Sequence, residues 1–312
     1  MSRQPAPGSP RIGVDLGGTK IEIAALDEAG RIVVRRRVAS PSHDYGQVVE
    51  TIGRLVEGVE SELGVSCSVG VGTPGSASVA NGLMKNANST VLIGQPLPRD
   101  LSARLGRDVR IANDANCFAL SEASDGAAAA QRCVLGVILG TGVGSGIVVD
   151  RQILTGPNGI AGEFGHNSLP WPQRSELPGP RCYCGKYGCI ETFLSGPGFV
   201  RDCVAGGGHA AGVAEILSAA QAGEAAAAAA LERYLDRLAR ALAAAVNLLD
   251  PDAVVLGGGI SNVTALYEEL PRRLPAYVFS DSLRTQILAP AHGDSSGVRG
   301  AAWLWPATAK PS

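Results

Sequence analysis

The chain has 312 residues, which is enough for two domains or for one large α/β unit. A formal net charge of −2, with 18% charged residues, gives no electrostatic reason to expect a nucleic-acid partner. The N-terminal segment lacks the apolar core of a secretory signal, and the longest apolar run, CVLGVILGTGVGSGIVV, is too short and too polar to cross a bilayer. These features predict a cytoplasmic protein with no membrane partner, in a compartment where thiols stay reduced.

The first structured segment is expected to hold three strands joined by short turns. Apolar alternation predicts the strands at residues 12–16, 21–26 and 32–38, and a helix with one apolar face follows at 46–63. A strand in SVGVGTPG comes next, then a polar loop to about residue 98, a short helix, and the strand of DVRIANDAN.

The later part of the chain repeats this opening arrangement. CVLGVILGTGVGSGIVVDRQIL again gives an apolar strand, a Gly/Thr-rich turn and an apolar strand, which predicts a duplicated domain with a cleft between the halves. Apolar residues spaced by three or four from Leu231 to Leu249 predict one long helix that ends at DPD. A strand in AVVLGGGIS and a last helix near GDSSGVRGAAWLW follow. Alternating strands and helices predict an α/β protein with ligands at the carboxyl ends of its strands.

Glycine-rich turns join the strands of both hairpins, DLGGTK at residues 15–20 and GTGVGSG at residues 140–146. No Walker-type or dinucleotide-binding fingerprint is present. Because glycine has no Cβ, backbone N–H groups in such turns can approach a polyphosphate, and a third glycine cluster at 257–259 favours this function over plain hairpin turns. Asp15 is placed to orient Mg²⁺; the alternative is an Asx contact that stabilises the turn.

Asn113 and Asp114 stand where the strand of RIANDAN is expected to end and a helix to begin. An aspartate at such a junction is commonly a helix cap. The alternative is a general base that takes the proton from an attacking hydroxyl, as phosphoryl transfer requires once its reactants are held in line. The two roles compete for Asp114 unless Asn113 serves as the cap.

A cluster of metal-binding residue types lies in the Pro/Gly-rich segment HNSLPWPQRSELPGPRCYCGKYGCIET. His166, Cys182, Cys184 and Cys189 supply four nitrogen and sulfur donors, the number that a tetrahedral structural zinc site requires. The Cys-x-Cys spacing is tighter than usual, so unliganded thiols stay an alternative. A disulfide is disfavoured by the reducing compartment.

As a set, the motifs DLGGTK, GTPG, NDAN, GTGVGSG, GEFGH, CxCGxxGCIE and LGGG resemble those of ROK sugar kinases, in the same order, from about residue 11 to residue 306. KNANST and HGDSSGVRGAAWLWP most resemble bacterial fructokinases of the manno(fructo)kinase type, with N-acetylglucosamine kinases close behind. The resemblance implies an α/β, actin/hexokinase-like (ribonuclease H-like) duplicated two-lobe fold with an interlobe cleft. The small lobe would span residues 1–118, completed by a helix at about 295–308, and the large lobe 119–294, with a zinc-binding insertion at about 166–191.

The resemblance further implies ATP-dependent phosphorylation of the 6-hydroxyl of a hexose, with D-fructose as the first expectation. N-acetyl-D-glucosamine, mannose or glucose are the alternatives within the family. A sugar-sensing ROK repressor is disfavoured because only about ten residues precede the first strand, and a non-catalytic sugar-binding protein because Asp114 and both turns are intact. The expected partners are the hexose and ATP, and the family suggests a homodimer.

The matching motifs assign residues to each part of the site, with Asp114 as the catalytic base. Sugar contacts would come from Gly75, Asn88, Asn113, Asp114, Glu163, His166 and Glu191. ATP and its Mg²⁺ would be held by Asp15, Gly17, Gly18, Thr19, Lys20, Gly140, Thr141, Gly142, Gly144, Gly257, Gly258 and Gly259. Structural Zn²⁺ would be bound by His166, Cys182, Cys184 and Cys189. One ring nitrogen of His166 would bind zinc while the other faces a sugar hydroxyl.

Overall fold

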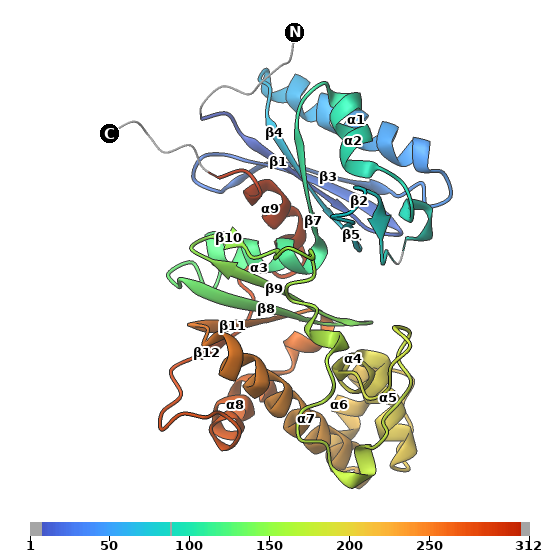
Figure 1. Cartoon of the computed structure of the whole chain (residues 1–312), viewed down its shortest axis with the longest axis vertical. Helices are drawn as coiled ribbons and strands as arrows, with labels where there is room; N and C mark the ends of the chain where they lie inside the picture. Colours follow the sequence, from blue (N-terminus) through green and yellow to red (C-terminus); the bar gives the residue numbers. More distant parts are fainter. Residues whose placement is uncertain (1–7, 88, 307–312) are drawn as a thin grey trace. The chain divides into compact units, whose positions relative to one another are not determined.

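The computed structural model describes residues 8–87 and 89–306, and Figure 1 draws their elements. Contacts divide the chain into two compact units. Unit 1 contains the residues up to Ala129, the segment Arg151–Ala161 and the residues from Ala291 on; unit 2 contains Ala130–Asp150 and Gly162–Pro290. A boundary at residue 118 would cut helix α3 (Asp114–Ser124), whereas the contacts keep that helix whole in unit 1.

Unit 1 is built on a five-stranded sheet with the order β3-β2-β1-β4-β7. β1 is antiparallel to β2 and parallel to β4, which is parallel to β7, so β1, β4 and β7 end at the same edge. The strands are β1 (Arg11–Leu16), β2 (Lys20–Leu26), β3 (Ile32–Ala39), β4 (Ser68–Thr73) and β7 (Val109–Asn113). Besides α3, the unit contains β5 (Ser76–Ala77), β6 (Met84–Lys85), β10 (Gln152–Ile153), α1 (Tyr45–Leu63), α2 (Leu97–Leu105) and α9 (Ser296–Trp303).

Helix α1 shows how the apolar pattern sets a boundary and a buried face. Asp44 caps its first turn by accepting a hydrogen bond from Gln47 N at 3.0 Å, and Gly64, with φ 68°, ends it. The apolar residues three or four positions apart are buried in the core of unit 1: Val48, Ile52, Val56 and Val59. The predicted strands and helix of this region are confirmed to within one residue at each end.

Helix α9 lies directly on strands β1 and β4 (Figure 1), and glycines make this approach possible. A Cβ on Gly13 would lie 1.9 Å from the carbonyl oxygen of Val298, and one on Gly70 would lie 1.8 Å from that of Ala301. Any other residue at either position would push the helix off the sheet. The close packing also brings the N-terminal end of α9 beside Asp15, because a Cβ on Gly297 would lie 3.2 Å from its carboxylate.

Unit 2 repeats the strand arrangement of unit 1. β8 is antiparallel to β9 and parallel to β11, which is parallel to β12, just as β1 relates to β2, β4 and β7. The duplication predicted from the two hairpins is therefore confirmed at the level of topology. The strands are β8 (Cys133–Leu139), β9 (Val143–Val149), β11 (Ala253–Gly257) and β12 (Gln286–Leu288). The helices are α4 (Ile190–Leu194), α5 (Gly196–Ala205), α6 (Val213–Gln221), α7 (Ala225–Leu249) and α8 (Thr264–Arg273).

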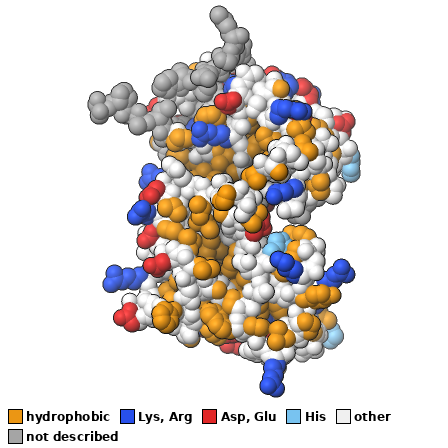
Figure 2. All heavy atoms as spheres, in the orientation of Figure 1, with side chains coloured by type: hydrophobic (Ala, Val, Ile, Leu, Met, Phe, Trp, Pro, Cys, Tyr) orange, Lys and Arg blue, Asp and Glu red, His pale blue; other side chains and the backbone are white. Residues whose placement is uncertain are grey.

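Helix α7 is the long helix that the leucine spacing predicts, and the alanine-rich run at 225–230 forms its first turns. Its apolar stripe, including Leu235, Leu238 and Leu242, is buried in the core of unit 2. Among the described residues no helix combines the length and apolarity needed to cross a membrane. On the face drawn in Figure 2, charged side chains of both signs are dispersed among hydrophobic and other side chains.

Candidate active site and metal centre

The carboxyl ends of β1, β4 and β7 bring several predicted site residues of unit 1 to one edge of its sheet. The register pairs Asp15 with Gly72, and Thr73 with Asn113. Gly75 follows β4 with φ 72°, and a Cβ there would lie 2.3 Å from the carbonyl oxygen of Lys85, so the backbone of this turn requires glycine. Asn88 lies outside the described residues.

The junction of β7 and α3 separates the two roles that compete for Asp114. The side chain of Asn113 caps the helix by accepting hydrogen bonds from Ala115 N at 2.8 Å and Asn116 N at 3.2 Å. Asp114 is the first helical residue, is exposed, and accepts a further hydrogen bond from Ala115 N at 2.8 Å. Asn113 therefore fulfils the capping role, as the sequence allows.

Asp15 is the other carboxyl group at this edge of unit 1. Its burial, together with the negative charge of Asp114, raises the pKa of Asp15 from its usual 3.8 to about 6. The negative charges of Asp15 and Asp114 thus repel each other. A bound cation would reduce this repulsion.

If Asp15 holds the Mg²⁺ of a bound nucleotide, as the sequence predicts, its raised pKa predicts a loss of nucleotide affinity in mild acid. Above pH 6 Asp15 carries the charge that would attract Mg²⁺, and below pH 6 it is protonated and neutral. We expect the affinity for the magnesium complex of a non-hydrolysable ATP analogue, measured by calorimetry between pH 5 and 8, to fall as pH drops through about 6. In Asp114→Asn the midpoint should move to lower pH, because one of the charges that raises the pKa is gone; an unmoved midpoint would contradict the coupling.

The glycine turns differ in what their glycines do. In the turn after β1, Gly17 N donates to Lys20 O at 2.9 Å and Thr19 is exposed. A Cβ on Gly18, Gly140 or Gly259 would meet no described atom within 4 Å, and none of the three has a positive φ. Packing in the described chain therefore does not require glycine at these three positions, which favours a ligand that approaches the backbone there.

Two of the turns lie next to one another in unit 2. Gly257 pairs with Ile138 where β11 and β8 end side by side. Gly258 has φ 81°, and a Cβ on it would lie 2.4 Å from the carbonyl oxygen of Leu139. The turn after β8, which contains Thr141, thus stands beside the 257–259 cluster, whereas Gly144 lies inside β9 and pairs with Ile138.

Glu191 connects the first of these turns to the cysteine-rich segment. Its Oε2 accepts a hydrogen bond from Val143 N at 2.9 Å, and a Cβ on Gly142 would lie 2.6 Å from the same oxygen. Glu191 belongs to the first turn of α4, which begins directly after Cys189. A residue expected to contact sugar therefore also holds the backbone of a glycine turn.

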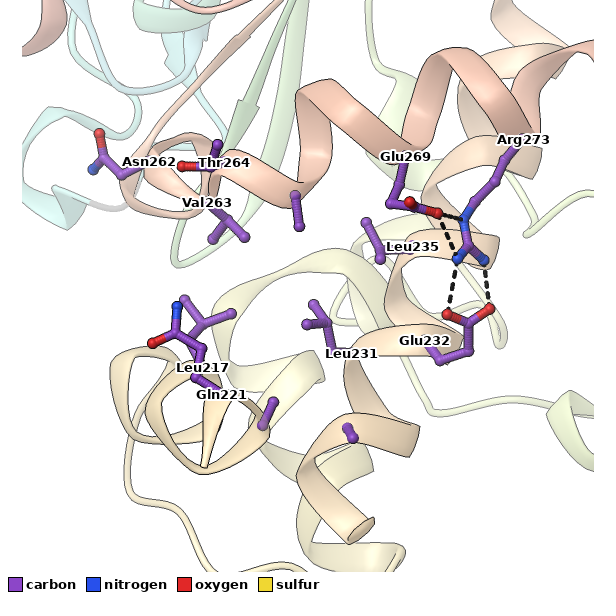
Figure 3. Close-up of a pocket in the computed structure, with 13 residues that line it drawn as sticks. Leu217, Gln221, Leu231, Glu232, Leu235, Asn262, Val263, Thr264, Glu269 and Arg273 are labelled. Carbon is purple, nitrogen blue, oxygen red and sulfur yellow. Dashed lines mark hydrogen bonds and ion pairs between the residues drawn. The ribbon is translucent and has the colours of Figure 1, made fainter. Parts of the chain in front are cut away.

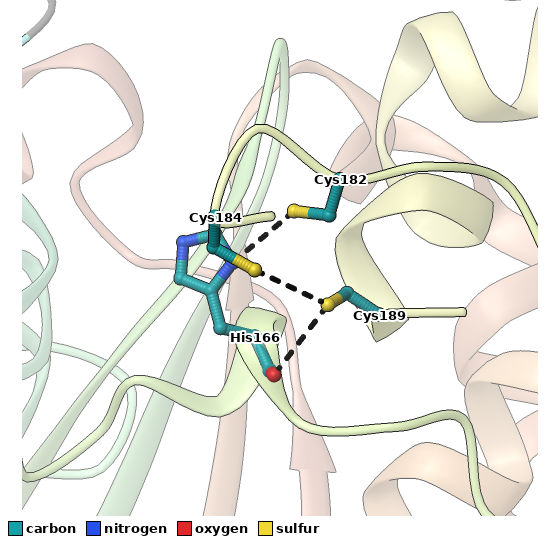
Figure 4. A group of neighbouring side chains, drawn as sticks. All are labelled: His166, Cys182, Cys184 and Cys189. Atoms are coloured by element: carbon teal, nitrogen blue, oxygen red, sulfur yellow. Dashed lines mark hydrogen bonds between the residues drawn. The ribbon is translucent and has the colours of Figure 1, made fainter. Parts of the chain in front are cut away.

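The predicted zinc ligands come together in the folded chain (Figure 4). The ligand atoms of His166, Cys182, Cys184 and Cys189 all lie within 4.8 Å of one another. Cys182 Sγ is 3.5 Å from His166 Nδ1, and Cys184 Sγ is 3.6 Å from Cys189 Sγ. Tetrahedral zinc with ordinary bond lengths separates its sulfur ligands by about 3.8 Å and sulfur from nitrogen by about 3.6 Å. The donor set fits zinc, and the cysteines are not joined as disulfides.

The segment before the cysteines places Glu163 and His166 along β9. A Cβ on Gly165 would lie 2.1 Å from the carbonyl oxygen of Val143, so glycine lets the GEFGH segment lie against the strand. Glu163 is exposed, and His166 points Nδ1 at the cysteine cluster. The second ring nitrogen, Nε2, lies 2.8 Å from the hydroxyl oxygen of Tyr183.

Unit 2 also contains a pocket of about 570 Å³ between α6, α7, α8 and the short helix η4 (Gly259–Asn262) (Figure 3). Its volume is within the range of small-molecule sites. The apolar side chains that line it include Leu217, Leu231, Leu235 and Val263. Asn262 and Gln221 add polar groups, and Arg273 forms ion pairs with Glu232 and Glu269 at the other end. The lining includes Asn262, three residues after the 257–259 glycine cluster.

The ROK family matches residues 11–308 of the chain. An N-acetyl-D-glucosamine kinase from Yersinia pseudotuberculosis serotype O:1b (strain IP 31758) is 44% identical over 296 residues, which cover 94% of this chain and 97% of that protein. The chain belongs to the ROK family. The crystal structure of a ROK hexokinase from Thermus thermophilus is 31% identical with a TM-score of 0.84, and covers 94% of this chain and 97% of its own.

A second ROK structure, a glucokinase from Streptomyces griseus in complex with glucose and AMPPNP, is 29% identical with a TM-score of 0.73 and covers 95% of this chain and 99% of its own. These structural neighbours confirm the expected actin/hexokinase-like fold class. The kinship to fructokinases is only loosely supported, because the curated relative is an N-acetyl-D-glucosamine kinase and the structures are of a hexokinase and a glucokinase.

One part of this ROK chain that sequence analysis missed is a buried ion cluster that anchors the cysteine-rich segment to α7. Glu176 accepts hydrogen bonds from Arg237 Nε and Arg240 Nη2, both at 2.8 Å. Arg240 Nη1 also donates to Trp171 O at 2.9 Å. Burial works against the Glu176 charge, but the hydrogen bonds from Arg240 and Arg237 outweigh it and lower the pKa of Glu176 to about 2.

Replacing Glu176 by glutamine is expected to destabilise the protein strongly. The change would remove the carboxylate that two buried guanidinium groups share, leaving Arg237 with Asp202 alone and Arg240 with Asp236 alone. Breaking a buried ion pair typically costs about 3–5 kcal/mol, which is the upper limit expected here. Because the folded pKa lies below the usual 4.5, the contribution of Glu176 is present above pH 4.5 and is lost as pH falls towards 2. Urea denaturation at pH 7 measures the cost. Glu62→Gln, which breaks a half-exposed pair with Arg36, is the control and should cost about 1 kcal/mol or less.

Proposed function

We propose that this ROK protein transfers the γ-phosphoryl group of ATP to the 6-hydroxyl of N-acetyl-D-glucosamine. The observation that carries the sugar assignment is the 44% identity to an N-acetyl-D-glucosamine kinase across 94% of the chain. D-fructose was the first expectation from two short motifs, but identity over the whole chain favours the alternative. Such a kinase requires a base, a nucleotide site and sugar contacts, and each can be assigned to described residues.

Asp114 is the proposed base. As the sugar's 6-oxygen attacks the γ-phosphorus, the carboxylate accepts the hydroxyl proton, and the bond between the γ-phosphorus and the bridging oxygen breaks to release ADP. Asn113 supports this role because it fulfils the capping requirement of α3. Its side-chain NH₂ group, together with the turn at Gly75, is proposed to contact the sugar.

The nucleotide site is proposed from the glycine turns. The turns that contain Gly18, Gly140 and Gly259 would present backbone N–H groups to the phosphates, since no packing contact of the described chain occupies the space beside these glycines. Asp15 would hold Mg²⁺, which neutralises charge on the phosphates. The apolar pocket whose lining includes Asn262 suits a planar adenine base, with Asn262 and Gln221 available to hydrogen-bond its edge.

The sugar contacts of unit 2 are proposed to be Glu163, His166 and Glu191. A zinc ion held by His166 and the three cysteines would supply a rigid link between the segments that carry these residues. Cys189 precedes Glu191 by two positions, and His166 is itself a ligand, so one metal fixes two sugar-binding side chains.

A coupled ADP-release assay of zinc-replete protein against a panel of hexoses tests the proposal. We expect kcat/KM to be highest for N-acetyl-D-glucosamine, and lower for glucose, mannose and fructose. A clear preference for fructose would restore the motif-based expectation and leave the mechanism intact. No turnover with any of the sugars would refute kinase activity itself. That the protein is a homodimer stays a prediction. Analytical ultracentrifugation of the same preparation measures its oligomeric state.

A further inference from the structure

Tyr183 stands between Cys182 and Cys184 and contacts the histidine of the cluster. Its hydroxyl oxygen lies 2.8 Å from His166 Nε2, and the two rings meet edge-on, with centroids 4.9 Å apart and an interplanar angle of 87°. The Tyr183 side chain is otherwise in solvent, with 80% of its surface exposed. Within the described part of the chain, this exposed tyrosine is held by the hydrogen bond and the ring contact to His166, so it can leave that position at little cost.

The protonation state of His166 determines what Nε2 can do. Nδ1 faces the sulfur atoms, 3.5 Å from Cys182 Sγ, so as a zinc ligand it must use its lone pair. The neutral ring then carries its proton on Nε2, and Tyr183 is the acceptor of that hydrogen bond. One N–H group donates one strong hydrogen bond, so any other acceptor for Nε2–H must displace the Tyr183 hydroxyl oxygen.

We propose that the Tyr183 hydroxyl and a sugar hydroxyl compete for the Nε2–H of His166, which makes Tyr183 a positioning residue that sugar binding displaces. The inference rests on the proposed function, in which His166 contacts the sugar. Without sugar, the Tyr183 hydroxyl fixes the orientation of the His166 ring through the hydrogen bond to Nε2. When sugar binds, one of its hydroxyl oxygens occupies the position of the Tyr183 oxygen and accepts that hydrogen bond instead. Only a sugar with a hydroxyl at that position can accept a hydrogen bond from His166 Nε2–H once Tyr183 has moved away.

The competition predicts that removing the Tyr183 hydroxyl tightens sugar binding. In Tyr183→Phe the ring stays while its acceptor is lost, so the sugar displaces only an exchangeable solvent water from Nε2–H and no longer breaks a hydrogen bond within the protein. We expect the Kd for N-acetyl-D-glucosamine, measured by calorimetry without nucleotide, to fall by about twofold to tenfold, the range set by the net value of one hydrogen bond. Tyr187→Phe is the matched control, because Tyr187 is an exposed tyrosine of the same loop with no side-chain hydrogen bond found within residues 8–87 and 89–306. Its Kd should match that of wild type.

A direct readout follows the tyrosine itself. In protein labelled with 3-fluorotyrosine, the ¹⁹F resonance that is missing from Tyr183→Phe belongs to Tyr183, and saturating N-acetyl-D-glucosamine should shift it. Among monodeoxy analogues of the sugar, the one that lacks the competing hydroxyl should bind wild type and Tyr183→Phe equally and leave the resonance in place.

Zinc retention separates competition from simple support of the metal site. Competition with a chromogenic chelator should show the same zinc affinity in Tyr183→Phe and wild type, because solvent water replaces the phenol on an accessible Nε2–H. Weaker zinc binding together with weaker sugar binding would overturn the proposal in favour of a supporting role. An unchanged Kd and an unmoved resonance, in protein shown to bind the sugar, would also overturn it. Wild-type protein that binds no N-acetyl-D-glucosamine would instead refute the proposed function on which the inference rests.

Discussion

Replacing Asp114 by asparagine is expected to lower kcat by about 10²–10⁴-fold, the usual contribution of a general base. The amide cannot accept the proton of the attacking hydroxyl, yet it has nearly the shape of the carboxylate and can still hydrogen-bond the sugar. The fold should survive, because Asn113 caps α3 and accepts hydrogen bonds from Ala115 N and Asn116 N. The coupled ADP-release assay gives kcat, and calorimetry gives the sugar Kd, which should change by less than about threefold.

Asp108→Asn is the matched control for this prediction. Asp108 is an exposed aspartate that precedes β7, whereas Asp114 follows the same strand, so the control removes one negative charge from the same region. Its kcat should equal that of wild type. An Asp114→Asn enzyme that keeps more than about one-tenth of the wild-type kcat would exclude Asp114 as the base.

The local elements of the fold follow from residue spacing alone. The hairpins around residues 15–20 and 140–146 each show an apolar alternation that glycine interrupts, and the structure has β1–β2 and β8–β9 there. Helix α7 is equally clear from its leucine stripe. By contrast, α5 and α6 lie in a stretch rich in alanine and glycine, and α8 has Pro271 inside it. These helices are defined by packing against α7, which no local pattern encodes.

The candidate site divides in the same way. The cysteine–histidine cluster could be predicted because its residues lie within one segment and are the usual ligands of zinc. The cap at Asn113 could be predicted because asparagine directly before a helix commonly accepts hydrogen bonds from the first turn. The ion cluster of Glu176 could not, since its partners Arg237 and Arg240 are 61 and 64 residues away. The spacing of Leu231 and Leu235 predicts the apolar face of a helix, and only the fold shows that the two side chains also line a pocket.

The contact between Tyr183 and His166 has a sequence signal, namely an aromatic residue placed between two cysteines of the cluster. The preferred sugar could not be predicted from the motifs, for a different reason. Two short motifs suggested fructose, but hydroxyl recognition depends on sub-ångström placement of side chains from many segments, so similarity across the whole chain is the better guide.

Loss of the proposed zinc site is expected to weaken sugar binding strongly while leaving nucleotide binding in place. Cys184→Ser removes the exposed thiolate of the four ligands, and a neutral hydroxyl binds zinc poorly. Without zinc, the loop that carries His166 and leads into Glu191 loses its main constraint, since structural zinc sites supply much of the folding energy of their segments. We expect zinc content to fall below about one-tenth of wild type and the sugar Kd to rise by at least about tenfold.

Nucleotide affinity distinguishes this local effect from general unfolding. The glycine turns at 140–146 and 257–259 are held by strands β8, β9 and β11, whose pairing does not involve Cys182, Cys184 or Cys189. The Kd of the magnesium complex of a non-hydrolysable ATP analogue should therefore change by less than about threefold, even allowing for the hydrogen bond between Glu191 and Val143 N. Cys133→Ser, a half-buried cysteine outside the cluster, is the control and should retain both zinc and sugar affinity. Dialysis of wild type against a chelator should reproduce the Cys184→Ser result, and restored zinc should reverse it. Unimpaired sugar binding by zinc-free protein would show that the metal does not position His166 and Glu191.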